Sequence, residues 1–374
     1  MREYVCRALM AVVLLGASAG GVLGAACEWP AWMQFRQDYI TPDGRVIDPS
    51  TPRQVTTSEG QSYALFFALV DNDRALFARL LAWTQDNLAQ GSLKQRLPAW
   101  LWGRHDDGQW RVLDNNSASD ADLWIAYTLL EAGRLWQEEH YQRLGIALLA
   151  RIAREEVVAL PGFGMMLLPG RYGFRRGALW TINPSYLPPQ ILARLAPLHG
   201  PWNRLQYSAL RMLQVTSPRG IVPDWTNWQR NKGWLATPGR AYISGYDAIR
   251  AYLWAGMLAE GAPAKRTLIK HWQPMAQLSE QLGYIPEKVG VLDGVPQGEG
   301  NVGFSAAMLP FLAASESPLL ATLRQRVLTN PPGKDNYYSS VLMLFGLGWD
   351  QQRFRFNLQG ELVPNWGATC VVSH

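Results

Sequence analysis

The sequence is poor in the residues that build metal centres and thiol chemistry. It holds three cysteines and five histidines among 374 residues. No CxxC pair and no cluster of histidines and cysteines at metal-ligand spacing occurs, so we expect no structural zinc site. Beyond residue 26 the chain also has no G-x-S-x-G turn of the kind that presents a nucleophilic serine. A serine hydrolase is therefore disfavoured, and any chemistry must come from other side chains.

Runs of like charge and linker-like segments are also absent. The 35 basic and 30 acidic residues leave a formal net charge of +5. Because the basic residues are scattered along the chain, we predict no nucleic-acid binding. The length allows one large domain, although it exceeds the usual size of about 100–200 residues.

The first 26 residues have the pattern of a secretory signal peptide. A basic start with Arg2 and Arg7 precedes a short apolar stretch, and small residues follow as far as Ala26. The stretch is shorter than the roughly 20 apolar residues that span a bilayer. We therefore predict a signal peptide over residues 1–26, export to the periplasm or medium, and no integral membrane segment in the mature chain. A retained signal anchor is the alternative.

Two cysteines remain in the mature chain, Cys27 and Cys370, one near each end. In an oxidising compartment two such cysteines are more often paired than reactive, so a disulfide joining the ends is one interpretation. Lipid attachment at Cys27 is the other. It is weakened by Gly24, which stands where lipoprotein signals usually carry leucine.

What the sequence does contain is a series of amphipathic helical segments separated by loops rich in Gly, Pro, Asn, Trp and Asp. In one of them Leu123, Ala126, Tyr127 and Leu130 follow three- and four-residue spacings. Strand-like alternation is scarce. We predict helices over residues 59–70, 73–87, 119–137, 141–157, 188–198, 200–215, 246–258, 263–282, 303–314, 319–328 and 337–346.

About eleven or twelve helices on one chain favour an all-α fold. Helical pairs closing into an (α/α)6 barrel, with a cleft formed by loops at one end, are the simplest single-domain arrangement. An open solenoid is the alternative, but no repeated side-chain signature occurs. The 17 tryptophans and 14 tyrosines fit either a large core or flat platforms for sugar rings.

Three predicted helices begin with acidic residues. Ser58 could cap the helix that starts at Glu59, and the acid itself favours the positive helix end. Taken alone, capping explains this glutamate. At the mouth of a barrel, however, a carboxyl partly desolvated by a neighbour such as Tyr63 would keep its proton and could act as an acid.

The other two acidic helix starts also allow two interpretations. Asp120 and Asp122 can open a helix. Two residues apart, however, they cannot both face the core without a large cost for burying their charges, so one is expected to point into a cleft. Arg250 follows Asp247 by three residues and can share its helical face. An ion pair between them would keep Asp247 ionised, as a general base requires, although an ordinary surface pair has the same spacing.

Acidic groups from separate helix starts are what an inverting glycosidase on a helical barrel needs. One acid protonates the glycosidic oxygen, and a second carboxylate, ~6.5–9.5 Å away, activates water on the opposite face of the sugar. The two groups must come from different elements because neighbouring residues cannot straddle a sugar ring. This mechanism requires no metal or organic cofactor.

The motifs resemble those of glycoside hydrolase family 8. Residues 118–136, which begin Ala-Ser-Asp-Ala-Asp-Leu-Trp-Ile-Ala and end with tryptophan, look like the family signature. Residues 58–63 resemble its general-acid motif and residues 246–250 its general-base motif. The resemblance runs from Trp29 almost to the C-terminus and is closest to the periplasmic cellulases that accompany bacterial cellulose synthases.

The resemblance implies roles for individual residues. Glu59 corresponds to the proton donor and Asp247 to the base. Asp120 matches a residue that the family signature has labelled a nucleophile. An inverting mechanism needs none, so we expect Asp120 to bind and distort the sugar. Tyr246 and Arg250 are expected to orient Asp247 and the water.

Tyr63, which follows the predicted acid, is also expected to contact the substrate. Four further aromatic residues are candidate sugar platforms, with core packing as the alternative for each: Trp102, Trp180, Tyr186 and Tyr337. The expected function is endo-hydrolysis of β-1,4-glucan by a catalytic domain over residues 27–374, with the glucan chain and the cellulose export machinery as partners. Another β-1,4-polymer (xylan, chitosan or mixed-linkage glucan) and a non-catalytic glucan-binding protein are the alternatives.

Overall fold

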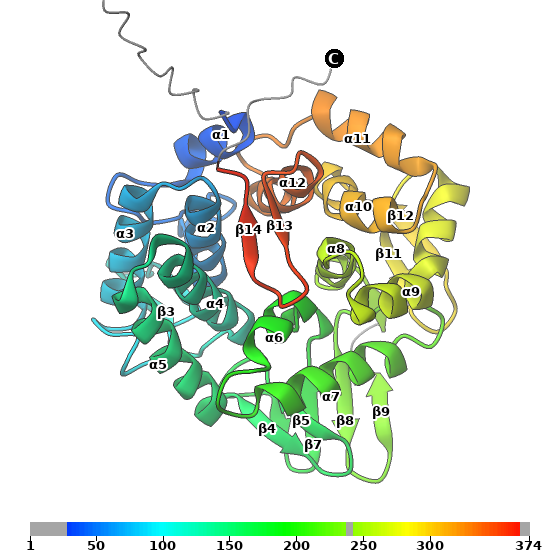
Figure 1. The fold of residues 1–374 in the computed structure, drawn as a ribbon, viewed down its shortest axis with the longest axis horizontal. Helices are drawn as coiled ribbons and strands as arrows, with labels where there is room; N and C mark the ends of the chain where they lie inside the picture. The colour runs from blue at the N-terminus through cyan, green and yellow to red at the C-terminus, as the bar shows by residue number, and fades with distance from the viewer. Residues whose placement is uncertain (1–27, 237–241, 367–374) are drawn as a thin grey trace, which may run out of the picture. The chain divides into compact units, whose positions relative to one another are not determined.

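Twelve α-helices form most of the part of the chain that the computed structural model describes, residues 28–236 and 242–366. Figure 1 shows an inner ring of helices with a second set outside it. The inner helices are α2 (Ser58–Val70), α4 (Ser119–Trp136), α6 (Pro189–Leu195), α8 (Ile249–Met257), α10 (Val302–Ala314) and α12 (Tyr337–Asp350). The outer helices are α1 (Pro30–Tyr39), α3 (Arg74–Trp83), α5 (Glu139–Glu155), α7 (Trp202–Val215), α9 (Pro263–Leu282) and α11 (Leu319–Thr329).

The two rings differ in the distribution of their apolar residues. The inner helices are apolar nearly all round: every residue of α8 is buried, and in α2 all except Glu59. In sequence order they contact one another from α2 through to α12. An outer helix such as α5 buries only one stripe, which includes Tyr141, Leu144 and Leu148. A helix that is apolar on all sides needs a partner on all sides, so the pattern dictates which helices lie inside. The predicted all-α barrel of helix pairs is confirmed.

The centre of the barrel is aromatic. Trp124 packs against Phe66, Trp254 and Phe345, with ring centroids 5.0–5.3 Å apart, so that α2, α4, α8 and α12 meet there. Many of the chain's aromatic residues are therefore core residues, which answers part of the question that composition left open.

Short strands lie at the ends of the helices, and the structure contains more of them than the sequence predicted. They form three small sheets, β1–β2–β3, β6–β7–β8–β9 and β10–β11–β12, and two hairpins, β4–β5 and β13–β14. The first seven strands are β1 (Thr56–Thr57), β2 (Leu101–Arg104), β3 (Trp110–Asp114), β4 (Val157–Leu160), β5 (Gly164–Leu167), β6 (Arg175–Arg176) and β7 (Leu179–Ile182). The others are β8 (Thr226–Gln229), β9 (Gly233–Ala236), β10 (Ile243–Ser244), β11 (Pro286–Gly290), β12 (Pro296–Glu299), β13 (Phe354–Phe356) and β14 (Leu362–Pro364).

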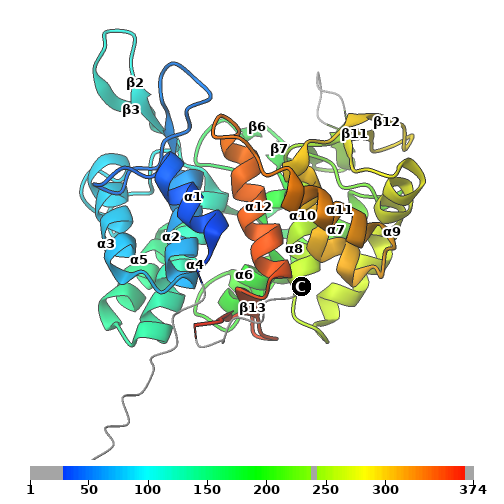
Figure 2. The same ribbon diagram turned by 90° about the horizontal axis from the view of Figure 1, so that it is seen from above.

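Three inner helices begin at the same end of the barrel, and each follows a short strand. β1 leads directly into α2, β3 precedes α4, and β10 precedes α8. Figure 2 shows the β2–β3 hairpin projecting from the same end as β6, β7, β11 and β12, while β13 lies at the opposite end. The starts of α2, α4 and α8 carry the acidic residues singled out from the sequence.

Several predicted boundaries are corrected. α1 was missed, and α3 is shorter than expected because Thr84–Leu88 continues it as a π-helical turn. α8 begins at Ile249 rather than Tyr246, so Asp247 lies in the turn before the helix. Within the described residues, no helix combines the length and apolarity needed to cross a bilayer. The predicted signal peptide and both cysteines, Cys27 and Cys370, lie outside the described residues.

Candidate active site

Arg250 links two of the predicted acidic residues. It lies in the first turn of α8 and is buried. Its Nη1 group donates to the carboxylate of Glu59 at the start of α2. Its Nη2 group donates to Oδ1 of Asp247 at 3.0 Å. The predicted ion pair with Asp247 is present, and the same guanidinium also holds Glu59, a contact that the spacing of residues does not reveal.

Asp120 is the third carboxyl of the group and sits deeper. Its side chain is only 4% exposed, and its Oδ2 lies 3.8 Å from Nη1 of Arg250. Neither carboxyl oxygen has a hydrogen-bond donor within reach among the described residues. Burial, followed by the charge of Glu59, raises the pKa of Asp120 well above its usual range. Three carboxyls therefore surround one guanidinium, an arrangement that favours a proton on one of them.

Asp247 is held by residues that the sequence analysis did not identify. The indole Nε1 of Trp225 donates to Oδ2 of Asp247 at 2.9 Å. Oδ1 of Asp224 accepts the backbone N–H groups of Gly245, Asp247 and Ala248 at 2.8, 3.2 and 2.8 Å. The turn before α8 is thus fixed by a side chain more than twenty residues away, which aims the Asp247 carboxylate.

The start of α2 is held in a similar way. Thr57, not Ser58, caps the helix: its hydroxyl accepts from the N–H of Gly60 at 3.0 Å. The N–H of Ser58 instead donates to the carbonyl of Trp100 at 3.0 Å. Because Thr57 and Trp100 accept these backbone N–H groups, the Glu59 side chain is not needed as a helix cap. Its carboxylate can therefore point to Arg250.

Tyrosines surround the charged group. Tyr186 and Tyr338 place their rings 5.7 and 5.9 Å from the Arg250 guanidinium carbon. The hydroxyl of Tyr338 donates to the carbonyl of Tyr246 at 2.6 Å, and the half-exposed Tyr246 ring contacts Phe304. Tyr186 and Tyr246 were predicted from the sequence; Tyr338 was missed.

Beneath these residues Tyr63 is buried. Its ring makes edge contacts with Trp124 and Phe345. Burial, followed by the Glu59 carboxylate, raises the pKa of the Tyr63 hydroxyl well above its usual range. Tyr63 thus supports the floor of the site, and the prediction that it contacts the substrate is corrected, because its ring is buried.

A pair of tryptophans stands on the β2–β3 hairpin. Trp102 pairs across the sheet with Thr56, and Thr56 precedes Glu59 by three residues. Its ring stacks on Trp110 with centroids 5.4 Å apart and planes 17° apart, and Trp110 is 44% exposed. The Arg45 guanidinium carbon lies 4.5 and 4.6 Å from the two ring centroids. Trp102 was predicted as a platform, whereas Trp110 and Arg45 were not identified.

The comparisons with known proteins identify the family of the chain. The family described as "Glycosyl hydrolases family 8" matches residues 3–352. The chain belongs to glycosyl hydrolase family 8. An endoglucanase of Escherichia coli O157:H7 is 54% identical over 98% of this chain and 98% of its own length. An endoglucanase of Xanthomonas axonopodis pv. citri is 47% identical, covering 94% of this chain and 93% of its own.

Solved structures place this family 8 chain among the same proteins. The crystal structure of an endo-1,4-D-glucanase from Vibrio fischeri ES114 superposes with a TM-score of 0.88 at 44% identity, covering 91% of this chain and 100% of that chain. A family 8 endoglucanase from Klebsiella pneumoniae gives a TM-score of 0.71 at 26% identity, with 87% and 100% covered.

Two predicted sugar platforms in this family 8 chain are corrected by their burial. Tyr337 is 6% exposed, its ring packs against Phe35 and Tyr39, and it lies behind Gly60. Trp180 is buried in β7 and lies beside Arg175, at a hollow that none of the three carboxyls lines. Neither ring presents a free face beside Arg250.

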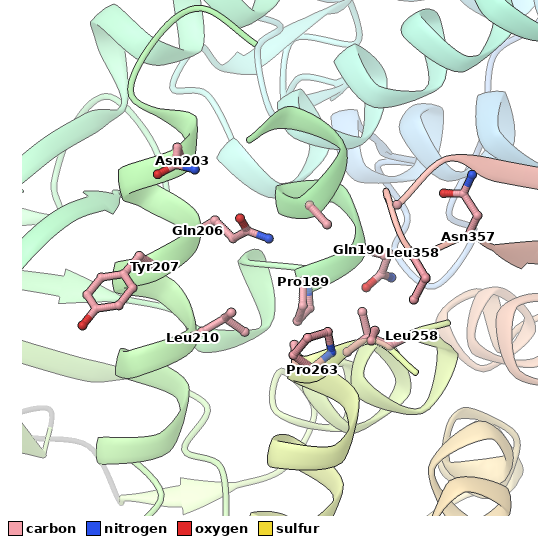
Figure 3. A pocket seen from close by; sticks show the side chains of 14 residues that line it. Pro189, Gln190, Asn203, Gln206, Tyr207, Leu210, Leu258, Pro263, Asn357 and Leu358 are labelled. Atoms are coloured by element: carbon pink, nitrogen blue, oxygen red, sulfur yellow. The ribbon is translucent and has the colours of Figure 1, made fainter. Parts of the chain in front are cut away.

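Another surface hollow also lies apart from Arg250 and its three carboxyls. Figure 3 shows it between α6, α7, the start of α9 and the turn after β13, with Gln190, Tyr207 and Leu358 among its lining residues. No acidic residue lines it. Within the described residues, no group of three or more His, Cys, Asp or Glu side chains is arranged to hold a metal ion.

Proposed function

We propose that this family 8 chain is an endo-acting β-1,4-glucanase that uses an inverting general acid/base mechanism. The endoglucanase relatives, aligned over nearly the whole chain, support the substrate class. The observation that carries the mechanism is the position of Arg250. It holds Glu59 through Nη1 and Asp247 through Nη2, so the two carboxylates lie on separate terminal nitrogens with the guanidinium between them.

Glu59 is the proposed general acid. It stands at the mouth of the barrel, its side chain is 23% exposed, and the Asp120 carboxyl lies close by at the same Arg250 nitrogen. Crowding of these carboxyls in a largely buried site favours retention of one proton. In the reaction that proton passes from Glu59 to the glycosidic oxygen as the bond to the anomeric carbon breaks.

Asp247 is the proposed general base. Arg250 and the Trp225 indole each donate to one of its oxygens, so both oxygens of the carboxylate are held in a fixed orientation. As water attacks the anomeric carbon, Asp247 takes its proton. Glu59 then regains a proton from solvent, and Asp247 returns its own to solvent. The product has the configuration opposite to that of the bond cleaved.

Asp120 is the proposed binding group for the sugar at the cleavage point. Its two oxygens are buried and without donors among the described residues. Sugar hydroxyls would supply those donors, and satisfying a buried carboxyl is a strong interaction. Such a bond favours a distorted ring that presents its hydroxyl to Asp120, which lowers the barrier to an oxocarbenium-like transition state.

The aromatic residues around the site are proposed to bind flanking sugars. Tyr186, Tyr246 and Tyr338 border the carboxyl group, and the Trp102–Trp110 stack extends the surface along the hairpin that pairs with β1. Aromatic faces bind the apolar C–H faces of glucose, so these rings suit a chain rather than a single sugar.

We further propose that the chain acts after export, in the periplasm or outside the cell, on nascent or misplaced cellulose, beside the cellulose export machinery. The signal-like first 26 residues and the subgroup resemblance of the motifs support this location.

The test is product analysis on cello-oligosaccharides. Wild-type protein should release reducing ends, and proton NMR should show the α-anomer first. Glu59→Gln should abolish release while keeping its melting temperature. Glu139→Gln on the exposed face of α5 is the matched control and should retain activity. Near-wild-type turnover by Glu59→Gln, or an initial β-anomer, would overturn the mechanism. A panel containing xylan, chitosan and mixed-linkage glucan tests the substrate class.

A further inference from the structure

A long stretch of the chain has almost no acidic residues. Residues 157–246 contain ten of the 35 basic residues but only one of the 30 acidic residues, Asp224. Asp224 is engaged elsewhere, because its Oδ1 accepts three backbone N–H groups in the turn before α8. Arg171 and Arg194 pair with glutamates of α5 and α4. The stretch therefore brings an excess of positive charge to the part of the molecule that it forms.

Four of these cations gather at one end of the sheet β6–β7–β8–β9, and we call them the basic cluster. Arg175 and Arg176 form β6. Arg230 follows the last residue of β8, and Lys232 precedes the first residue of β9. Strand pairing places Arg176, the residue before Arg230 and the residue after Lys232 in one row across the sheet. Because neighbouring strands lie about 4.8 Å apart, this row is roughly 15 Å long. All four residues are exposed, and none forms an ion pair within 4 Å among the described residues.

Part of the basic cluster lines a hollow of about 460 Å³. Arg175 and Arg230 line it together with apolar residues that include Val158, Pro161 and the buried Trp180. The Arg175 guanidinium carbon lies 5.4 Å from the centroid of the Trp180 ring. No acidic residue lines the hollow. Two guanidinium groups without an acidic partner, beside an apolar lining, fit an anionic group better than a neutral or cationic one.

The basic cluster stands at the same end of the barrel as the candidate active site. Figure 2 places β6 and β7 at this end. The chain leads from Leu179, at the start of β7, to Ser185, whose hydroxyl accepts from Nη2 of Arg250 at 3.4 Å. Six residues can extend over at most about 22 Å, which limits the separation of Leu179 and Ser185. A polymer that is bound at the site can therefore also reach the cluster.

An exposed aromatic residue lies on the chain segment that precedes the cluster. Tyr172 is 61% exposed and comes three residues before Arg175. Its backbone N–H donates to Oδ1 of Asn116 at 3.1 Å, and its carbonyl accepts from Nδ2 of Asn116 at 3.0 Å. Asn116 comes four residues before Asp120, so Tyr172 is anchored close to the start of α4. Aromatic rings bind the apolar faces of sugars, and Tyr172 offers such a ring on this side of the site.

We propose that the basic cluster binds acidic substituents of the glucan chain held at the active site, so that a β-1,4-glucan bearing carboxylate groups binds more tightly than a neutral one. The proposal rests on the proposed glucanase function. No residue of the cluster touches a reacting atom, so its effect is on substrate selection and not on the chemical step. The same charges disfavour a cationic polymer such as chitosan.

The position of the cluster favours a glucan over other anionic partners. An exposed cation contributes little to binding a free anion. The substituents of a glucan that the active site already holds reach the cluster at a high effective concentration, so that several weak contacts add to the affinity. A lipid surface or an acidic protein would have to bind through the cluster alone.

Binding of two soluble glucans of equal chain length tests the proposal, with carboxymethyl cellulose as the anionic and hydroxyethyl cellulose as the neutral probe. The full chain carries Glu59→Gln so that the probes stay intact during calorimetric titration. The cluster variant replaces the four cations with glutamine: Arg175→Gln, Arg176→Gln, Arg230→Gln and Lys232→Gln. The matched control removes the same charge from exposed residues that also form no ion pair within 4 Å among the described residues: Arg79→Gln, Arg96→Gln, Arg266→Gln and Lys270→Gln.

The cluster variant should bind carboxymethyl cellulose about tenfold more weakly at low ionic strength, because four attractive charges are lost. Its Kd for hydroxyethyl cellulose should stay the same. The control variant should bind both probes nearly as the parent protein does, and the melting temperatures of all three proteins should agree. A salt titration of the parent protein needs no variant: its preference for carboxymethyl cellulose should disappear at about 0.5 M NaCl, where exposed charges are screened.

Several results would overturn the proposal. Equal losses in the cluster and control variants would mean that only net charge matters, and a preference that persists at high salt would mean that charge does not cause it. Equal weakening of both probes in the cluster variant would assign these residues to the sugar chain itself. Loss of binding to phosphatidylglycerol vesicles in the cluster variant, with both glucans bound as before, would assign the cluster to a lipid surface.

The proposed function is tested separately by hydrolysis. A wild-type chain that cleaves neither probe would refute the glucanase function. A wild-type chain that cleaves both, with carboxymethyl cellulose bound equally by the cluster variant and its parent, would refute only the role of the cluster.

Discussion

The indole of Trp225 donates a 2.9 Å hydrogen bond to the carboxylate of Asp247, on the oxygen that Arg250 leaves free. Each oxygen of the proposed base thus has its own donor. Trp225 comes from the segment before β8, and its ring is stacked on Phe174 with planes 4° apart. The base is therefore oriented by packing contacts from elsewhere in the chain as well as by its helix.

Replacing Trp225 with Phe should slow catalysis by roughly 10–100-fold in kcat, because a hydrogen bond to a charged group contributes about 1.5–3 kcal/mol. The ring remains, so the KM for cello-oligosaccharides should change little. Trp136→Phe is the control. Trp136 lies at the C-terminal end of α4, and the substitution removes a hydrogen bond of similar length from its indole to Asn72. Equal losses in the two variants would contradict a specific role for Trp225.

Arg250→Lys should lower kcat more than 100-fold while the protein still folds. A lysine ammonium is a single point charge and cannot hold Glu59 and Asp247 on two separate nitrogens. Arg324 is the control, because it lies away from the site. Its Nε and Nη2 groups donate to the carboxylate of Asp350 at 2.7 and 2.8 Å. Arg324→Lys should affect thermal stability alone. Steady-state kinetics and melting curves of both variants check this.

Gly60→Ala should displace the start of α2 and reduce activity. A Cβ at Gly60 would lie 2.6 Å from the hydroxyl of Tyr337. That hydroxyl is buried and has no hydrogen-bond partner among the described residues. We expect a cost of about 1–3 kcal/mol in the free energy of unfolding, together with lower kcat because Glu59 moves.

The double variant Gly60→Ala/Tyr337→Phe should recover most of both losses, since removing the hydroxyl removes the clash. Tyr337→Phe alone should keep full activity. Denaturant unfolding and kinetics on the three variants form a double-mutant cycle. Loss of activity in Tyr337→Phe alone would mean that the hydroxyl serves catalysis rather than packing.

Asp224 should make stability depend on pH below neutrality. Burial raises its pKa from 3.8 to about 6. The folded state therefore holds a proton that the unfolded state releases between about pH 4 and 6, and the free energy of unfolding falls as pH rises through this window. Relative to Asp224→Asn, the wild-type protein should lose about 2–3 kcal/mol across it. Parallel unfolding curves for the two proteins at pH 4 and pH 7 would contradict the shift.

Trp110→Ala should weaken binding of long glucans. We expect a severalfold higher KM for cellohexaose or soluble cellulose and little change for the shortest oligosaccharide cleaved, because stacking on an exposed ring contributes about 1 kcal/mol. Tyr207 is also exposed, on α7 at the hollow of Figure 3, and Tyr207→Ala is the control that should leave both values unchanged. Equal KM changes for short and long substrates would place Trp110 outside the binding surface.

Much of the fold could be predicted because the periodicity of a helix is visible in the local sequence. The period of 3.6 residues and the proline at the start of α9 predicted Pro263–Leu282 with the bounds that the structure shows. Strands of two to five residues are too short to show alternation, so the sheets at the ends of the barrel were not anticipated. The start of α8 was misplaced because Asp224, distant in sequence, holds the turn before it.

Neighbouring residues on a helix illustrate the limit of sequence patterns. Tyr337 and Tyr338 are chemically identical and adjacent at the start of α12. They differ by about 100° around the helix axis, so one packs behind Gly60 and the other lies beside Arg250. The sequence analysis chose Tyr337, and only the rotation of α12 in the packed barrel shows that Tyr338 is the residue at the site.

By itself the sequence determined the helical barrel and the candidate site residues, because helical period and acidic helix starts are local properties. Glu59, Asp120, Asp247 and Arg250 could all be named from it. Which groups touch was decided by tertiary structure: Arg250 meets Glu59 across 191 residues, and Trp225 meets Asp247 across 22. Such pairings depend on how α2, α4 and α8 pack, and the packing is the sum of contacts along the whole chain.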